Sequence, residues 1–258
     1  KSMTALSPEE RRIAILQMLE RDASVQVTQI AEAFGVSRVT ARTDLDALAR
    51  DGKLRRTHGG ATSLSRTLTV SVQDRRINLN VDAKRRIARR AASLVEEGDS
   101  ILVDSGTTSL EFVRALSGLA GITVVTDDFT IADFVDRSMP ATDVIMLGGV
   151  LRKGHRYTDG PLALASLARL HPDKAFVTPT AYAPGRGLLT NNQAMAELKR
   201  AFLSCAEKTY ILMDASKVGA RGLMWFGTLA ECDAVVMDVD PEGRIAAELE
   251  EMSTELLL

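Results

Sequence analysis

The segment from residue 34 to residue 52 constrains this chain most, because it has the pattern of a tight turn followed by a capped helix. Gly35 suits the left-handed backbone that ends one helix and turns the chain. Ser37 follows where an N-cap would lie, and its hydroxyl can accept hydrogen bonds from free N–H groups of the next helix. Apolar residues then recur at helical spacing and predict one buried face, formed by Val39 or Ala41, Leu45 and Leu48.

The other face of this helix carries polar side chains, which are Arg38, Thr40, Arg42 and Thr43. A short helix with one buried side and one donor-rich side suits the major groove of DNA. Residues 28–34 predict the helix before it, opened by Thr28, because their apolar residues fall at positions i, i+1 and i+4. A helix, a glycine turn and a serine-capped helix together form a helix-turn-helix.

A basic segment follows at residues 53–61 and contains two adjacent glycines. It predicts a small hairpin, or wing, whose cations reach phosphates or the minor groove of DNA. A DNA contact and a structural role in the turn explain His58 about equally well. The candidate DNA-binding residues are therefore Ser37, Arg38, Thr40, Arg42, Thr43, Lys53, Arg55, Arg56 and His58.

The start of the chain predicts a helix from Ser7 to about Arg21, with Pro8 at its first position and Glu10 closing a capping box. Residues 25–27 predict a short strand beside the wing. The expected division of the chain is a winged helix-turn-helix DNA-binding domain at residues 4–60, a linker rich in Thr, Ser and Arg at 61–80, and an effector-binding domain at 81–258.

Asn80 is expected to cap a long helix that ends at Gly98. That helix has a basic face, interpreted as solvated, with a subunit contact or an auxiliary DNA contact as alternatives; its cations are Lys84, Arg85, Arg86, Arg89 and Arg90. From residue 100 onward short apolar strands alternate with helices. Strands are expected at residues 101–103, 122–125, 143–147, 175–177, 209–213, 233–237 and 255–258, and helices at 107–116, 129–135, 161–170, 193–206 and 242–252.

This alternation predicts an α/β domain with a largely parallel sheet and helices on both faces, where ligands bind at the carboxyl ends of strands. Residues 104–108, Asp-Ser-Gly-Thr-Thr, follow the first strand and open a helix. They make an anion pocket that suits a phosphate, with a plain N-cap cluster as the alternative. Turn chemistry or surface ion pairs explain each of the further loops separately, but their shared location at strand ends favours one common site. Those loops contribute Asp127, Gly148, Gly149, Arg152 and Lys217.

Residues 36–45, Val-Ser-Arg-Val-Thr-Ala-Arg-Thr-Asp-Leu, and residues 55–61, Arg-Arg-Thr-His-Gly-Gly-Ala, resemble the DNA-binding domain of the DeoR family of bacterial transcription regulators. The loop motifs, with Lys84 upstream, resemble the effector domain of the same family. The resemblance implies a C-terminal fold similar to ribose-5-phosphate isomerase and related sugar-phosphate-binding folds. It also implies phosphorylated-sugar binding by the Asp-Ser-Gly-Thr-Thr loop and the lysine of Asp-x-Ser-Lys, which are Asp104, Ser105, Gly106, Thr107, Thr108 and Lys217.

The chain departs from the usual family pattern within these motifs. Ala41 and Thr43 stand where the family usually has Ile and Arg, so the reading helix has one cation fewer. Asp127 stands where the family usually has Asn, and an anionic side chain there would favour hydroxyl donors and repel a second acidic group. Residues 178–182, Thr-Pro-Thr-Ala-Tyr, replace a segment that is often glycine-rich in the family.

The net charge of −2 is unevenly spread, with 11 Lys and Arg against 8 Asp and Glu in residues 1–66, and 21 against 26 in the remainder. A basic head on an acidic body fits a DNA-binding module joined to another domain. Cys205 and Cys232 lack the spacing of a metal site and fit buried thiols of a reduced cytoplasmic protein. The histidines are scattered and no apolar run reaches the length of a membrane helix, so no metal, cofactor or membrane partner is expected.

Together with these features, the family resemblance implies a cytoplasmic, non-enzymatic repressor of a carbohydrate-metabolism operon, released from its operator DNA by a phosphorylated sugar or polyol. One short recognition helix reads few base pairs, so we expect a homo-oligomer, either a dimer or a tetramer. One alternative is a sugar-phosphate isomerase-like enzyme with an added DNA-binding domain, in which Asp104 or Asp127 would be the base. Another is a helix-turn-helix scaffold used only for protein contacts, against which the wing cations argue.

Overall fold

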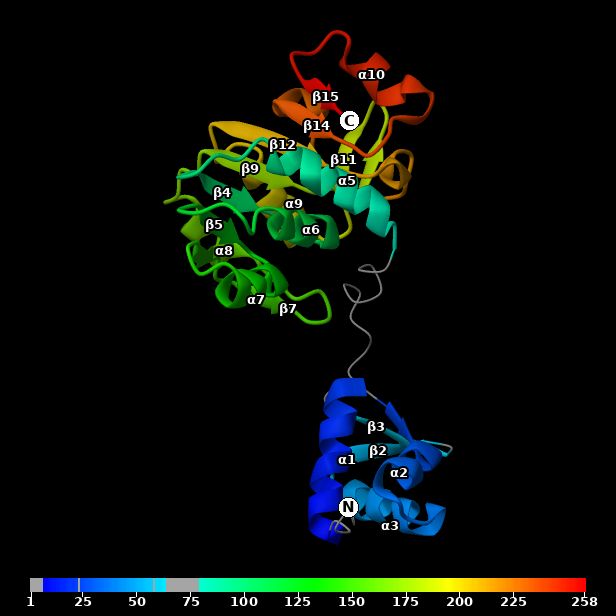
Figure 1. Ribbon diagram of the computed structural model, residues 1–258. Coiled ribbons are helices and arrows are strands. Elements are labelled where there is room, and N and C mark those ends of the chain that lie inside the picture. The colour runs from blue at the N-terminus through cyan, green and yellow to red at the C-terminus, as the bar shows by residue number, and fades with distance from the viewer. Residues whose placement is uncertain (1–6, 23, 58, 64–78) are drawn as a thin grey trace. The chain divides into compact units, whose positions relative to one another are not determined.

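The computed structural model describes residues 7–22, 24–57, 59–63 and 79–258 (Figure 1). His58 and most of the expected linker lie outside the described residues. The chain divides into two compact units, Lys1–Ser71 and Val72–Leu258. None of the helices within the described ranges is long and apolar enough to cross a membrane.

The N-terminal unit combines three helices with a three-stranded antiparallel sheet in the order β1-β3-β2. This is the expected winged helix-turn-helix, in which β2 and β3 form the wing and β1 extends it. Its elements are α1 (Pro8–Asp22), β1 (Ser24–Gln26), α2 (Val27–Phe34), α3 (Arg38–Arg50), β2 (Leu54–Thr57) and β3 (Gly60–Ser63).

Local chemistry explains where these helices begin and end. The Ser7 and Glu10 side chains form the predicted capping box, with Ser7 N–H donating to Glu10 over 2.9 Å and Glu10 N–H to Ser7 over 3.3 Å. Gly35 ends α2 in the left-handed conformation at φ 64°. The expectation that Thr28 opens α2 is wrong, because Gln26 occupies the N-cap position and closes a capping box with Gln29.

The wing strand β3 runs to Ser63, past the domain boundary expected at residue 60. Gly60 lies so close to β1 that an added Cβ would stand 2.1 Å from the Val25 carbonyl oxygen, so only glycine fits there. Apolar side chains of the three helices and the sheet form the core of this unit, and they include Ile15, Leu19, Val25, Ile30, Leu45, Leu48 and Leu54.

The C-terminal unit is built on a seven-stranded, wholly parallel sheet in the order β15-β14-β12-β9-β4-β5-β6. Smaller antiparallel pairings, β10-β11-β13 and β7-β8, lie outside it. The strands are β4 (Ser100–Val103), β5 (Thr123–Thr126), β6 (Asp143–Met146), β7 (Val150–Arg152), β8 (Tyr157–Asp159), β9 (Lys174–Val177), β10 (Ala181–Ala183), β11 (Gly187–Thr190), β12 (Lys208–Leu212), β13 (Met224–Gly227), β14 (Ala234–Val236) and β15 (Glu255–Leu257).

Helices cover both faces of the main sheet, as the alternating pattern predicts (Figure 1). One core packs under α5, α6 and α7, and the other under α8, α9 and α10. Short 3-10 helices follow β12, β13 and β14. The helices are α5 (Val81–Ala92), α6 (Thr107–Ala115), α7 (Phe129–Ser138), α8 (Pro161–Leu167), α9 (Gln193–Phe202), α10 (Arg244–Leu249), η1 (Ala215–Lys217), η2 (Leu229–Glu231) and η3 (Pro241–Gly243).

The first helix of this unit differs from its prediction at both ends. It ends at Ala92, because the chain turns there well before Gly98. Asn80 occupies the N-cap position at φ 52° but makes no side-chain cap hydrogen bond. Its amide instead donates to Asp214, over 3.4 Å, and to Ser216, over 3.3 Å, which joins the start of α5 to η1.

Candidate functional site

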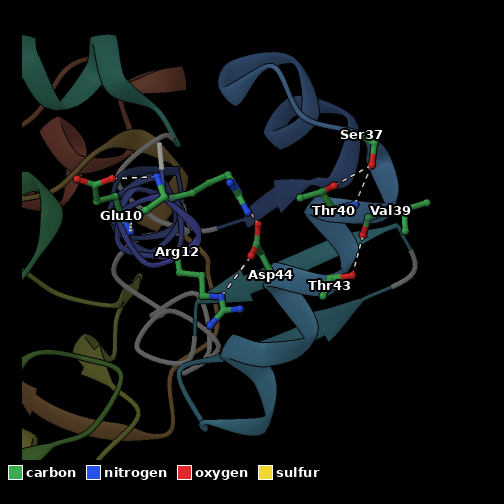
Figure 2. A network of polar contacts seen from close by, with 9 residues as sticks. Glu10, Arg12, Ser37, Val39, Thr40, Thr43 and Asp44 are labelled. Carbon is green, nitrogen blue, oxygen red and sulfur yellow. Dashed lines mark hydrogen bonds and ion pairs between the residues drawn. The ribbon is translucent and has the colours of Figure 1, made fainter. Parts of the chain in front are cut away.

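The recognition helix α3 presents a polar face whose end is fixed by Ser37 (Figure 2). Thr40 N–H donates to the Ser37 hydroxyl over 3.0 Å, which is the predicted N-cap bond, and the two hydroxyl oxygens lie 2.9 Å apart. Arg38, Arg42 and Thr43 are exposed. The structure therefore places the predicted α3 residues together on an accessible face, with Thr40 half-buried beside the cap.

A buried carboxylate holds α3 against α1, and sequence reasoning missed it. Asp44 is 2% exposed and accepts from Arg11 Nε over 2.6 Å and from Arg12 Nε over 3.2 Å (Figure 2). From helical periodicity alone, an acidic residue near the DNA-binding face of a helix is expected to be exposed to solvent. Here it fixes the orientation of the recognition helix.

The wing places its cations in two different environments. Lys53 and Arg55 are exposed. Arg56 instead donates from Nε to Asp46 over 2.7 Å and from a terminal nitrogen to the Gly60 carbonyl. The guanidinium of Arg56 therefore ties the wing to α3, and its expected contact with DNA stays a prediction.

The C-terminal unit has a pocket of about 340 Å³ at the carboxyl ends of parallel strands. Loops after β4, β9 and β12 line it, together with α5, α9 and the β7–β8 hairpin. Of the predicted effector residues, those that line it are Ser105, Gly106, Thr107, Thr108, Arg152 and Lys217.

The start of α6 forms one wall of this pocket. Gly106 has φ 151°, and an added Cβ would lie 3.2 Å from Thr178 Oγ1, so this position favours glycine for both conformation and space. The Gly106 N–H donates to Asp128 over 3.2 Å. The N–H groups of the first turn of α6 have no i−4 carbonyl partner in the helix, so Thr107 and Thr108 can present theirs to an anion.

Two predicted effector carboxylates do not line the pocket. Asp104 is fully buried and forms an ion pair with Lys199, and it also accepts from Thr178 N over 2.8 Å and Thr178 Oγ1 over 3.0 Å. Asp127 is likewise fully buried, and burial raises the pKa of its carboxyl well above the ordinary value, with the nearby Asp104 carboxylate raising it further. Both belong to the packed interior rather than to the cavity wall.

The glycines after β6 do not line the pocket either. An added Cβ on Gly149 would stand 2.4 Å from the Asp159 carbonyl oxygen, so this residue allows β7 and β8 to approach closely. Gly148 has open space around it. Gly149 thus serves the hairpin that carries Arg152, and the expected role of Gly148 and Gly149 at the effector stays a prediction.

Several lining residues were not predicted. Lys84 lines the pocket and is only 5% exposed, which overturns its assignment to a solvated basic face. Tyr157 lines it from β8, and burial raises the pKa of its hydroxyl to about 12, so the hydroxyl stays neutral. Helix α9 contributes Lys199, whose ammonium also donates to the Thr178 carbonyl over 2.8 Å. Only the tertiary fold reveals that these positions face one cavity.

Family models match both units of the chain. The DeoR-like helix-turn-helix domain matches residues 11–67, and the DeoR C terminal sensor domain matches residues 79–239. A putative aga operon transcriptional repressor from Escherichia coli O157:H7 is 32% identical over 89% of this chain and 86% of its own length. The HTH-type transcriptional repressor GlcR of Bacillus subtilis is 29% identical over 97% of this chain and 96% of its own.

The chain therefore belongs to the DeoR family, and it is a DNA-binding transcriptional regulator of that type. Among solved structures, ribose 5-phosphate isomerase A of Methanocaldococcus jannaschii aligns with a TM-score of 0.40 and 18% identity, over 54% of this chain and 55% of that chain. That likeness is too distant to bear on what the pocket binds.

Proposed function

We propose that this regulator represses a carbohydrate-metabolism operon and that a phosphorylated sugar or polyol releases it from its operator. One observation carries the proposal: four cations from separate elements line a single pocket against one lining carboxylate, Asp214. The cations are Lys84, Arg152, Lys217 and Lys199, the last of which is paired with the buried Asp104. A phosphate monoester carries roughly −1.5 to −2 charges at neutral pH, so it matches such a surface. The relatives named as repressors support the direction of regulation.

In this proposal the phosphate lies against the first turn of α6. The N–H groups and hydroxyls of Thr107 and Thr108 face an anion there, and Lys217 supplies a counter-charge from η1. Further polar residues line the same pocket and can pair with the hydroxyls of the sugar or polyol, and they are Thr180, Thr190, Asn191 and Asn192. The pocket therefore offers partners both for the phosphate and for the hydroxyls of such a ligand.

The proposal treats the site as a sensor rather than a catalyst. Asp104, one of the two carboxylates considered as a base, is engaged by Lys199 and Thr178 beneath the cavity wall. Asp127 is fully buried and is not part of the wall. Proton abstraction needs a base within hydrogen-bonding reach of the substrate, so this arrangement favours binding without turnover.

We further propose a homo-oligomer, a dimer or a tetramer, on a symmetric operator. A single α3 contacts few base pairs, and a second copy doubles the sequence that is read. The effector then acts by binding one arrangement of the subunits more tightly than the arrangement that fits the operator. Light scattering of the protein with and without operator tests the stoichiometry.

A thermal-shift screen of the full chain tests the effector class, with sugar phosphates, the matching unphosphorylated sugars and inorganic phosphate as probes. A ligand present at 100 times its dissociation constant stabilises the folded state by about 2.7 kcal/mol. We expect stabilisation by a phosphorylated sugar or polyol and release of operator DNA by the same compound. Equal stabilisation by the unphosphorylated sugar contradicts the phosphate site, and product formation by the purified protein contradicts the sensor role.

A further inference from the structure

The recognition helix carries an apolar side chain on its accessible face. Val39, the second residue of α3, is 69% exposed, whereas Ala41 is fully buried. Of the two residues that the sequence offered for the buried face of α3, Ala41 is therefore the one in the core. Figure 2 shows Val39 on the outer side of α3, in the same view as Thr43 and Ser37. Val39 therefore contributes little to the core of its own domain.

The hydroxyl of Thr43 is committed to the helix. Its Oγ1 donates to the Val39 carbonyl over 3.0 Å, so the hydroxyl proton is not available to a base. Thr43 follows Val39 by four residues, and side chains at this spacing lie on the same face of a helix. Val39 and Thr43 together therefore place methyl groups beside the exposed Arg38 and Arg42.

In the DNA major groove, thymine is the base that presents a methyl group, and apolar side chains contact it. Residues near the N-terminus of a recognition helix are the ones that reach base edges. We infer that Val39 is a specificity-determining residue that reads a thymine methyl group in each operator half-site, with the Thr43 methyl group beside it. The inference rests on α3 being the helix that enters the major groove.

The expected size of the effect follows from the burial of one methyl group. Burial of one such group contributes about 0.8 kcal/mol, which corresponds to about a fourfold change in Kd because 1.4 kcal/mol is tenfold. For a symmetric operator with two half-sites, the Kd then rises by about fifteenfold. The effect is independent of salt because no charge is removed.

The test begins with duplexes selected from a random library by the full-length protein. Each thymine of a selected half-site is then replaced in turn by deoxyuridine, which lacks only the methyl group. We expect one replacement to weaken binding by the parent about fourfold per half-site. Val39→Ala should bind the thymine duplex more weakly and lose the discrimination, while Val39→Thr, which keeps the branched shape and one methyl group, should retain part of it.

Arg42→Ala is the matched control on the same face. It should weaken binding to the thymine and deoxyuridine duplexes equally, so their ratio stays at the parental value. The inference is overturned if the selected half-sites contain no thymine. It is also overturned if the parent binds the thymine and deoxyuridine duplexes equally at every position. If Val39→Ala still binds the thymine duplex more tightly than the deoxyuridine duplex, another residue contacts the methyl group, and the inference is also overturned. If Arg42→Ala and Val39→Ala both bind like the parent, the assignment of α3 to the major groove fails instead.

Discussion

Arg56 Nε lies 2.7 Å from Asp46 Oδ1, so the strand β2 of the wing is joined to the recognition helix α3. The Arg56 side chain is 30% exposed and also donates to the Gly60 carbonyl across the hairpin. The neighbouring Arg55 is exposed. Two adjacent arginines thus have different environments, although the sequence gives no sign of the difference.

Replacement of Arg55 and of Arg56 should therefore have different effects on DNA binding. Arg55→Ala should lower the slope of log K against log salt by roughly 0.9 if Arg55 neutralises one phosphate. Arg56→Ala should weaken binding without changing that slope, because it loosens the wing. Fluorescence anisotropy of operator binding across a salt series measures both. A change of slope in Arg56→Ala would show that its guanidinium leaves Asp46 for the phosphate backbone.

Asp44→Ala should loosen the packing of α3 on α1. The carboxylate is 2% exposed and pairs with Arg11, whose side chain is 9% exposed, so its removal leaves a buried cation with one partner fewer. Loss of one partner of a buried pair costs about 3 kcal/mol. Amide hydrogen exchange in the full chain should show reduced protection in α1 and α3 only. Glu32→Ala, which removes an exposed carboxylate of α2, is the control and should leave protection unchanged.

Lys199→Met should destabilise the C-terminal unit. The Asp104 carboxylate is fully buried, and without Lys199 it keeps the Thr178 donors but loses this ion-pair partner. The expected loss in the free energy of unfolding is about 3–5 kcal/mol, measured by urea denaturation. The double variant Asp104→Asn/Lys199→Met should recover most of it, because no unpaired charge remains. If the double variant is as unstable as Lys199→Met, packing rather than charge explains the loss.

Asp127→Asn should stabilise the protein by an amount that grows with pH. Burial raises the pKa of the folded-state carboxyl well above its ordinary value of 3.8. Between those two pKa values the unfolded chain releases a proton that the folded chain keeps, so the stability present below the unfolded pKa is lost as the pH rises. An asparagine side chain does not titrate, so Asp127→Asn loses no stability in this way as the pH rises.

The measurement is the difference in unfolding free energy between parent and Asp127→Asn at pH 5 and pH 8. Asp143→Asn, at an exposed position of β6, is the control for the loss of one carboxylate. A difference for Asp127→Asn that is the same at both pH values would mean that the Asp127 carboxyl stays ionised in the folded protein.

The sequence predicts those structural features that depend on residues close together in the chain. The Ser7–Glu10 capping box, the Ser37 cap and the Gly106 turn each involve residues within three positions of one another or a backbone that only glycine adopts easily. The alternation of strands and helices is predicted for the same reason. The position of Lys84 and Lys199 at one pocket depends on the order of strands in the sheet, which local patterns do not encode.

Sequence patterns also miss buried charges. A periodic pattern assigns a lysine or an aspartate to a solvated face, because an isolated charge is costly to bury. Lys84 and Asp44 are buried in this fold, Asp44 with Arg11 as its partner. Arg11 lies 33 residues from Asp44 in the chain, so the local pattern around Asp44 carries no sign of this pair.

The last prediction concerns the proposed effector pocket. Gly106→Val should block the approach of a phosphate to the start of α6, since its Cβ would lie 3.2 Å from Thr178 Oγ1 in a backbone conformation of φ 151°. Lys217→Ala removes a half-buried cation of the pocket wall. Both variants should bind operator DNA like the parent but remain bound when a phosphorylated effector is added.

Lys153→Ala is the matched control, because Lys153 is an exposed cation of the β7–β8 hairpin that does not line the pocket. It should release DNA at the parental effector concentration. Lys217→Ala should shift the midpoint of release by at least tenfold, because a charge-assisted hydrogen bond contributes about 1.5–3 kcal/mol. If Gly106→Val and Lys217→Ala both release DNA at the parental concentration, the effector binds elsewhere. If Gly106→Val also loses operator binding, its fold is damaged. Lys217→Ala alone then decides whether the effector binds in this pocket or elsewhere.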